Sequence, residues 1–107
     1  FHSYSELETT SEFVDELRKA QRPLFCTEYL ARTIQCTFAS HLPYFKERNI
    51  SCFNWGLVSG KTQTIYSWTD HYPNGEEPPL WFHDIYRKDG TLYSEEESNL
   101  IRSLTGK

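Results

Sequence analysis

The chain of 107 residues has a net charge of −4, an apolar content of 37% and a high aromatic content of 16%. These values fit one folded domain, or part of one, and exclude a disordered chain. The acidic balance provides no basic surface for nucleic acid, and no stretch approaches the roughly 18 apolar residues of a membrane-spanning helix. Because the sequence begins with Phe1 rather than Met, we expect its true N-terminus to lie elsewhere.

The cysteines form no metal-ligand or disulfide pattern. Cys26, Cys36 and Cys52 are odd in number, lack a C-x-x-C spacing and have no histidine at zinc-ligand spacing. Cys26 and Cys52 fall in strand-like segments, where a free cysteine behaves as a small buried apolar residue. We therefore predict structural thiols. The compartment stays open, since a cytoplasmic and an exported location both fit the sequence.

The chain order begins with a strand end over residues 1–4 and a helix over residues 9–20. Thr9, followed three residues later by Glu12, has the capping-box pattern of a helix N-terminus. The apolar residues of this helix are expected to fall on one face, and they are Phe13, Val14 and Leu17.

Pro23 ends that helical segment, and residues 23–28 form a short apolar run of strand length. Residues 37–48 are typical of a second helix, in which Pro43 predicts a kink or a shortened first turn. The apolar face of this helix combines Phe38, Leu42 and Phe45 at helical spacing. Residues 49–57 are then typical of a further strand.

A long irregular stretch follows over residues 58–93, rich in glycine, proline, threonine and aromatic side chains. Ser94 with Glu97 forms a second capping-box pattern, which predicts the start of a last helix. Gly106 is a suitable C-terminal stop for it. The acidic residues of its first turn suit the helix dipole and do not indicate catalysis.

Alternating strands and helices predict a parallel sheet with helices packed on it, so the fold class is α/β. Only two strands and one strand end are present, and a parallel sheet of that size cannot bury both of its faces. We therefore expect residues 1–107 to be part of a larger α/β domain whose missing part lies on the N-terminal side.

Side-chain parity places Leu24, Cys26 and Glu28 on one face of the first full strand, and Phe53 and Trp55 on one face of the next. In a closed barrel these faces would point inward. Glu28 and Trp55 would then lie at the C-terminal strand ends, where (β/α)8 barrels hold catalytic residues. A doubly wound open sheet would also bind ligands at that edge, but no strand is followed by a glycine-rich phosphate loop.

Three strand ends supply residue types that sugar chemistry requires. The segments FHSY, CTEY and FNWG contain a histidine and a tyrosine, then a carboxylate, then an asparagine and a tryptophan. Glycoside hydrolysis needs a carboxylate at the anomeric carbon, polar neighbours that keep it ionised, and an aromatic plate for the apolar face of the sugar. The candidates are His2, Tyr4, Glu28, Asn54 and Trp55.

The chain resembles the last part of the (β/α)8 clan of retaining β-glycosidases, which includes cellulases, mannanases and xylanases. The resemblance lies in FHSY, RPLFCTEYLAR, HLPYFKERNISCFNWGLVSGKTQTIYSW and EPPLWFHDIYRKDGTLYSEEE, and it covers nearly the whole chain. It is strongest to bacterial sequences described as cellulase-like or endo-1,4-β-xylanase-like. It implies the C-terminal portion of a TIM barrel, from the end of strand six to helix eight.

By that resemblance Glu28, at the end of strand seven, is the nucleophile, and His2 and Tyr4 line the site and hold it. Trp55, at the end of strand eight, forms the floor of the sugar subsite. The clan's general acid/base, a glutamate after an asparagine at the end of strand four, has no counterpart in this chain. The resemblance therefore implies a carbohydrate substrate, no metal or organic cofactor, and an isolated chain that is inactive in hydrolysis.

Further candidates follow the last strand. Trp68 and Trp81 are either additional sugar subsites or residues packed under the long loop, and Lys61 and Gln63 have side chains that can reach substrate hydroxyls. A second hypothesis is a small non-catalytic α/β module that binds carbohydrate or a protein through Trp55 and these two tryptophans. The sugar, the linkage and the oligomeric state stay open.

Overall fold

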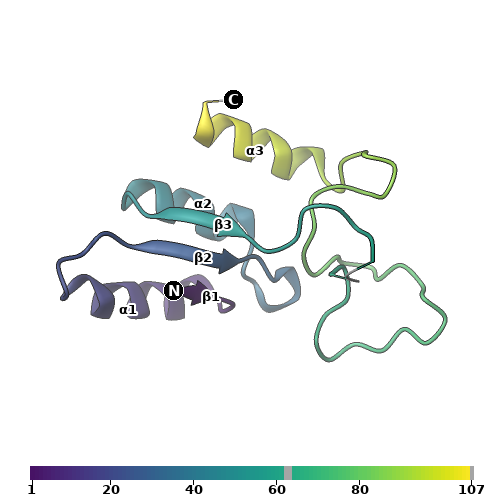
Figure 1. The fold of residues 1–107 in the computed structure, drawn as a ribbon, viewed down its shortest axis with the longest axis horizontal. Helices are drawn as coiled ribbons and strands as arrows, with labels where there is room; N and C mark the ends of the chain where they lie inside the picture. The colour runs from purple at the N-terminus through teal and green to yellow at the C-terminus, as the bar shows by residue number, and fades with distance from the viewer. Residues whose placement is uncertain (62–63, 107) are drawn as a thin grey trace.

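A computed structural model describes residues 1–61 and 64–106, which form a parallel sheet and three helices (Figure 1). The strands follow the order β1-β2-β3 and are β1 (His2–Ser3), β2 (Phe25–Tyr29) and β3 (Ser51–Asn54). The helices are α1 (Leu7–Arg18), α2 (Phe38–Glu47) and α3 (Glu95–Thr105), with a short 3-10 turn at Arg32–Ile34. The α/β class and the parallel strand direction are confirmed, and a barrel stays a prediction.

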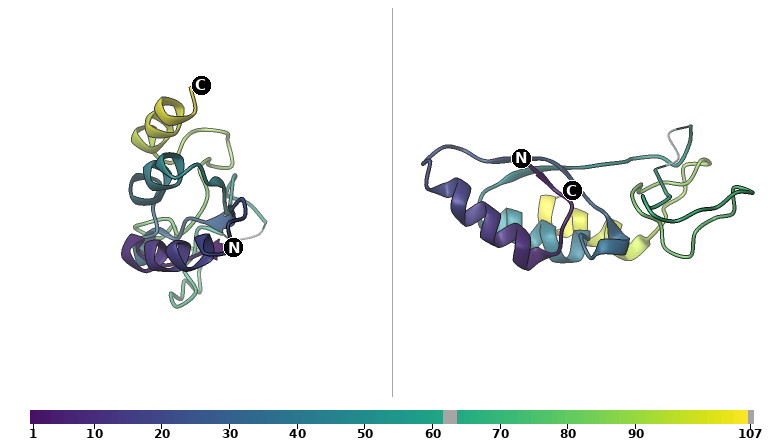
Figure 2. Two further views of the ribbon diagram at one scale, coloured as in Figure 1. Left: turned by 90° about the vertical axis from the view of Figure 1, so that its left-hand side faces the viewer. Right: turned by 90° about the horizontal axis from the view of Figure 1, so that it is seen from below.

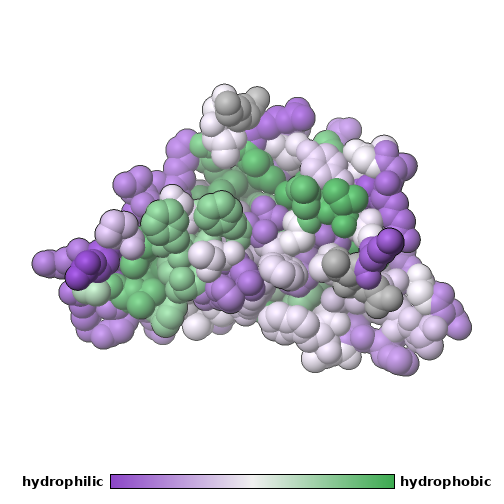
Figure 3. Space-filling model, in the orientation of Figure 1, coloured by the Kyte–Doolittle hydropathy of each residue, from purple (hydrophilic) through white to green (hydrophobic). Residues whose placement is uncertain are grey.

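The helices cover only one face of the sheet. In both views of Figure 2 the three helices lie to one side of the strands. The opposite face exposes Phe25 and Phe53, at 52% and 60% of their surface, and Figure 3 shows hydrophobic residues gathered over the strands in the orientation of Figure 1. Parallel sheets normally have both faces covered, so this uncovered face is suited to further packing.

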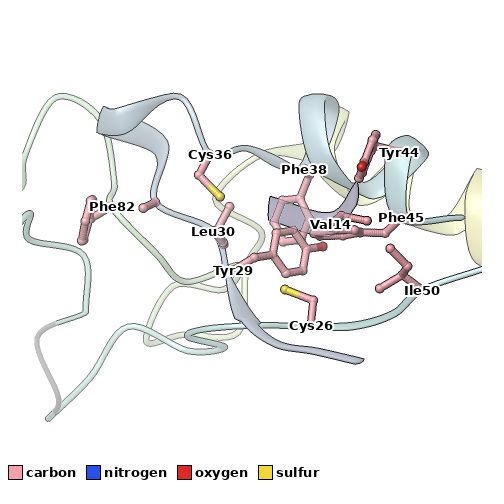
Figure 4. Close-up of a cluster of buried hydrophobic side chains, with 11 residues drawn as sticks. Val14, Cys26, Tyr29, Leu30, Cys36, Phe38, Tyr44, Phe45, Ile50 and Phe82 are labelled. Carbon is pink, nitrogen blue, oxygen red and sulfur yellow. The ribbon is translucent and has the colours of Figure 1, made fainter. Parts of the chain in front are cut away.

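The core lies between the sheet and the helices α1 and α2. Cys26 and Tyr29 of β2 meet Val14 of α1 and two phenylalanines of α2, Phe38 and Phe45 (Figure 4). The Tyr29 ring makes edge contacts with both phenylalanines, at centroid distances of 5.8 and 5.4 Å. Burial of each large apolar side chain contributes on the order of 1.5–3 kcal/mol, so these contacts fix β2 on α2.

Helix α1 begins earlier than the capping-box pattern predicts. Its N-cap residue is Glu6, which makes no side-chain cap, so the predicted capping role of Thr9 is wrong. The earlier start turns Thr10 toward the sheet. There the Thr10 hydroxyl lies 2.6 Å from Ser3 Oγ and 3.0 Å from His41 Nε2. These buried hydrogen bonds stabilise the helix with its earlier start.

The apolar face of α1 also differs from the prediction. Val14 is fully buried and Leu17 is half-buried, whereas Phe13 is 47% exposed. The inward face therefore combines Thr10, Val14 and Leu17, which follow a helical spacing of i, i+4 and i+7. A polar residue takes the first of these positions because its hydroxyl has hydrogen-bond partners inside the core.

The two later helices are confirmed close to their predicted bounds. Thr37 Oγ1 accepts a hydrogen bond from Ser40 N, and the Ser40 hydroxyl oxygen accepts one from Thr37 N. Pro43 lies inside α2. Of its two predicted effects, the shortened first turn is wrong, because this cap completes the turn before the proline, and the kink stays a prediction. Ser94 caps α3 as predicted, and Gly106 ends it with a φ of +74°.

The predicted parity of β2 is wrong at Glu28. Cys26 and Tyr29 are three residues apart and both buried, because the pairing of β2 with β3 is irregular between them. Glu28 pairs in register with the exposed His2 of β1, and paired side chains on parallel strands share a face. Glu28 therefore lies on the uncovered face of the sheet, opposite to Cys26.

The segment between β3 and α3 is irregular, as its composition predicts. Its described residues form isolated bridges only, in which Tyr86 pairs with Val58 and with Leu92. The segment returns to the end of β2, where the backbone N–H of Arg32 donates to Phe82 O at 3.0 Å. This return brings the WFHD stretch to the C-terminal end of the sheet.

Candidate functional site

The Glu28 carboxylate lies near the C-terminal end of β2 and has two neighbours from the start of the chain. Tyr4 Oη donates a hydrogen bond to Glu28 Oε2 at 2.7 Å. His2 Nδ1 lies 3.3 Å from the same oxygen. The register explains this group, because His2 is level with Glu28 in the sheet and Tyr4 follows two residues later. The structure thus brings together three of the residues that the sequence singles out.

Both contacts fall on one oxygen of the Glu28 carboxylate. Within residues 1–61 and 64–106, no hydrogen bond to Oε1 is found, and the side chain is 27% exposed. One oxygen is therefore held in place while the other is unengaged. A nucleophilic carboxylate needs this combination of a fixed orientation and an available lone pair.

Tyr4 is a permanent hydrogen-bond donor to this carboxylate. Burial, together with the hydrogen bond to Glu28, holds the pKa of the Tyr4 hydroxyl well above its ordinary value. The phenol therefore keeps its proton across the neutral range. Hydrogen bonds to charged groups contribute about 1.5–3 kcal/mol, so this contact is strong enough to set the orientation of the Glu28 side chain.

Aromatic rings from the long segment stand beside Tyr4. The Trp68 ring meets Tyr4 edge-on at a centroid distance of 5.4 Å and meets Phe82 at 5.0 Å. Trp68 is nevertheless 66% exposed, so most of its indole is open next to the Glu28 group. Such a ring suits a sugar, because sugar rings have an apolar face that packs on an aromatic plate.

The two candidates at the end of β3 have local partners. The Trp55 backbone N–H donates to Tyr29 O at 2.7 Å, and the indole is 46% exposed. The Asn54 side-chain amide donates to Gly56 O at 2.6 Å, in the turn after the strand. In the described part of the chain neither side chain has a hydrogen bond to Glu28, so their roles toward substrate stay predictions.

The candidates in the long segment divide into two kinds. Lys61 is exposed, and Gln63 lies outside the described residues. The role of both residues as contacts of substrate hydroxyls therefore stays a prediction. Trp81 is only 3% exposed, its ring stacks on Tyr93 at 4.6 Å, and its Nε1 donates to Glu77 Oε1 at 2.9 Å. For Trp81 the packing alternative is therefore the correct one.

Sequence reasoning misses His83 as a neighbour of the site. Its ring is 4% exposed, lies 6.0 Å from the Tyr4 ring, and makes a hydrogen bond between Nδ1 and Leu30 O. Burial lowers the pKa of His83 below its ordinary value, so the imidazole is neutral at pH 7. The feature of the sequence that could have indicated His83 is the polar pair His-Asp inside the apolar run PPLWFHDI.

Arg32 holds the WFHD stretch in place. Arg32 is 5% exposed, and its guanidinium makes two hydrogen bonds to the Glu97 carboxylate of α3, at 2.9 and 2.7 Å. It also donates to three backbone carbonyl groups, those of Trp81, His83 and Asp84. The planar, permanently charged guanidinium suits this many acceptors. One side chain therefore links the end of β2, the long segment and α3.

Asp84 and Gly56 form a second close contact near the site. Asp84 is 1% exposed and has a φ of +54°. Its Oδ2 accepts a hydrogen bond from the Thr64 hydroxyl, whereas Oδ1 has no partner among the described residues. Gly56 has a φ of +87°, and a Cβ at this position would lie 2.6 Å from Asp84 Oδ1. The close approach therefore requires glycine.

Comparisons with known proteins add no relative to this picture. No protein-family model, no curated protein and no solved structure matches the chain. Among residues 1–61 and 64–106, no helix combines the length and the apolar content that crossing a bilayer requires. Membership of the retaining β-glycosidases therefore stays a prediction from the four sequence segments, and the Glu28 group is the arrangement on which it can be tested.

Proposed function

We propose that this chain supplies the nucleophile side of the active site of a retaining β-glycosidase that acts on β-linked polysaccharides or oligosaccharides. The observation that carries the proposal is the Glu28 carboxylate, whose Oε2 accepts a hydrogen bond from Tyr4 and lies 3.3 Å from His2 Nδ1, and whose Oε1 is unengaged in the described chain. In such enzymes one carboxylate attacks the anomeric carbon and forms a glycosyl ester, which water then hydrolyses.

The roles of the neighbouring residues follow from their contacts. Tyr4 fixes the rotamer of Glu28, and its hydroxyl donates a hydrogen bond that stabilises the charged form of the Glu28 carboxylate. Trp68, exposed beside Tyr4, provides an aromatic surface for the sugar ring. Trp55, exposed at the end of the adjacent strand, is the second candidate platform. Tyr4 and Trp55 follow the C-terminal ends of β1 and β3, the usual place of ligands in α/β folds, and Trp68 packs against Tyr4 there.

The uncovered face of the sheet supports a barrel context. Phe25 and Phe53 expose more than half of their surface there, and Glu28 lies on the same face. We propose that further strands close this sheet into a (β/α)8 barrel and bring the general acid/base to Glu28. In retaining enzymes the two carboxyl groups are about 5–5.5 Å apart. Within residues 1–61 and 64–106, Glu28 makes no hydrogen bond to a second carboxyl group.

The proposal is tested with a glycoside that does not need the general acid. A 2,4-dinitrophenyl 2-deoxy-2-fluoro-β-glycoside loses dinitrophenolate as a stable anion when a carboxylate attacks, and the fluorine slows hydrolysis of the ester. We expect the chain to release one equivalent of dinitrophenolate from a glucoside, xyloside or mannoside and then to stop. The Glu28→Gln variant should release none. Equal release from both proteins would refute the nucleophile assignment.

A second candidate function is a non-catalytic sugar-binding module. The exposed indoles of Trp55 and Trp68 favour it, because exposed tryptophans are common sugar platforms. This module would bind β-linked oligosaccharides equally well with Glu28→Gln and would release no dinitrophenolate. The burst experiment therefore separates the two functions.

A further inference from the structure

The backbone of His83 and one of its two ring nitrogens are fixed by hydrogen bonds. Its backbone N–H donates to Thr64 O at 3.1 Å, and its carbonyl accepts from the Arg32 guanidinium. The ring nitrogen Nδ1 is bonded to Leu30 O. The position and the ring plane are thus fixed by three segments, and the remaining polar atom is Nε2.

The partner at Nδ1 decides which nitrogen carries the proton. The Leu30 carbonyl oxygen can only accept a hydrogen bond, so His83 Nδ1 must donate. A neutral imidazole has one N–H, and Nε2 is therefore an acceptor with an available lone pair. Burial lowers the pKa of His83, in keeping with the neutral ring.

The Nε2 atom is unpartnered in the described chain and is not fully buried. The fully buried side-chain polar atoms that lack a hydrogen bond in the described chain are Tyr44 Oη and Asp84 Oδ1. His83 Nε2 makes no hydrogen bond within residues 1–61 and 64–106, yet it is not one of them. The small exposed fraction of His83, 4%, is therefore consistent with an opening at this nitrogen.

The surroundings of His83 connect it to the candidate site. Its ring lies 6.0 Å from that of Tyr4, whose hydroxyl holds Glu28. Tyr4 also contacts the exposed Trp68, whose ring meets Phe82. The charged groups that act on the imidazole are Asp84, Arg32 and Glu28. A sugar placed on Trp68 and against Glu28 would lie beside the Tyr4 and Phe82 rings that flank His83, and its hydroxyl groups are hydrogen-bond donors.

We propose that His83 is a further substrate-contacting residue, whose Nε2 accepts a hydrogen bond from a hydroxyl of the sugar bound against Glu28. This inference rests on the proposed function and adds a polar specificity contact to it. The bond selects for a hydroxyl at one ring position, because the tautomer fixed by Leu30 offers an acceptor and no donor there.

The test is a titration of the 107-residue chain with cellohexaose, xylohexaose and mannohexaose, followed by NMR. The variant His83→Asn keeps an amide N–H in the place of Nδ1 and removes Nε2, so it should fold and bind the preferred hexasaccharide about 3- to 10-fold more weakly, as expected for one neutral hydrogen bond. The matched control is His71→Asn, at an exposed histidine of the long segment, which should bind like the wild type.

The ¹⁵N resonances of the histidine ring give a readout that a purely structural role would not move. In the free wild-type protein Nδ1 should carry the proton, and the Nε2 resonance should shift when the hexasaccharide saturates the chain. This measurement uses the wild type and stands even where the variant fails to fold. An unmoved Nε2 resonance at saturation, a proton on Nε2, or unchanged binding by a folded His83→Asn variant overturns the His83 inference alone. Absence of binding by the wild type overturns the proposed function as well.

Discussion

Replacement of Arg32 by methionine is expected to cost this chain a large part of its stability. Arg32→Met retains an unbranched side chain but removes the guanidinium. It leaves the Glu97 carboxylate, whose side chain is only 20% exposed, without its bidentate partner. It also removes the donor to the carbonyl groups of Trp81, His83 and Asp84.

The magnitude follows from the burial of this pair. Removal of one partner from a buried ion pair typically costs about 3–5 kcal/mol, since the remaining charge is left uncompensated. A domain of this size is stable by about 5–15 kcal/mol, so at the middle of both ranges the loss is about two-fifths of the total. The exposed pair Lys19–Glu16, with side-chain exposures of 72% and 70%, provides the contrast. Exposed pairs contribute about 1 kcal/mol or less.

The assay is urea unfolding followed by tryptophan fluorescence, with Lys19→Met as the matched control. We expect Arg32→Met to lower the free energy of unfolding by several times more than the control does. The double variant Arg32→Met/Glu97→Gln should recover part of the loss, because no charge is then left without a partner. If Arg32→Met unfolded at the same urea concentration as Lys19→Met, the structural role assigned to Arg32 would be wrong.

Two further stability predictions concern the glycine at the site and the buried histidine of α2. Gly56→Ala should lower the free energy of unfolding by more than the roughly 1–2 kcal/mol of a left-handed alanine, since its Cβ would meet Asp84 at 2.6 Å. Gly75 has a similar φ, but an added Cβ there would meet no atom within 4 Å. Gly75→Ala therefore measures the backbone contribution to the loss of unfolding free energy, in urea titrations run in parallel. Burial lowers the pKa of His41 below its ordinary 6.5, so the unfolded chain binds that proton more readily. Stability should therefore decline as the pH falls below about 6.5, and His41→Gln should flatten this decline; a pH-independent wild type would contradict it.

Local sequence patterns predict the helices and strands well where the sequence contains a clear capping residue or a short apolar run. Ser94 and Gly106 bound α3 as their residue types suggest, and the alternation of strands and helices predicts the parallel sheet. The start of α1 is not predicted, because the Thr9 pattern competes with the tertiary hydrogen bonds of Thr10 to Ser3 and His41. Contacts across the chain, which a local pattern does not contain, decided that boundary.

The site shows the same division. His2, Tyr4 and Glu28 meet because strand ends in a parallel sheet lie side by side, and that follows from the strand order. The face on which Glu28 lies does not follow from alternation, because an irregularity in β2 changes the parity between Cys26 and Tyr29. His83 and Arg32 escape detection for another reason. Their contacts join β2 to a segment some 50 residues later, which has no regular periodicity from which its path could be predicted.

The position of a covalently bound sugar tests the central claim most directly. After incubation with the dinitrophenyl 2-deoxy-2-fluoro-β-glycoside, the chain is digested and the modified peptide is sequenced by mass spectrometry. The account predicts one sugar per chain, attached to Glu28 in the peptide that contains PLFCTEYLAR, and no modification of the Glu28→Gln variant. A sugar found on another carboxylate, or a chain that binds the hexasaccharides but is never labelled, would contradict the account.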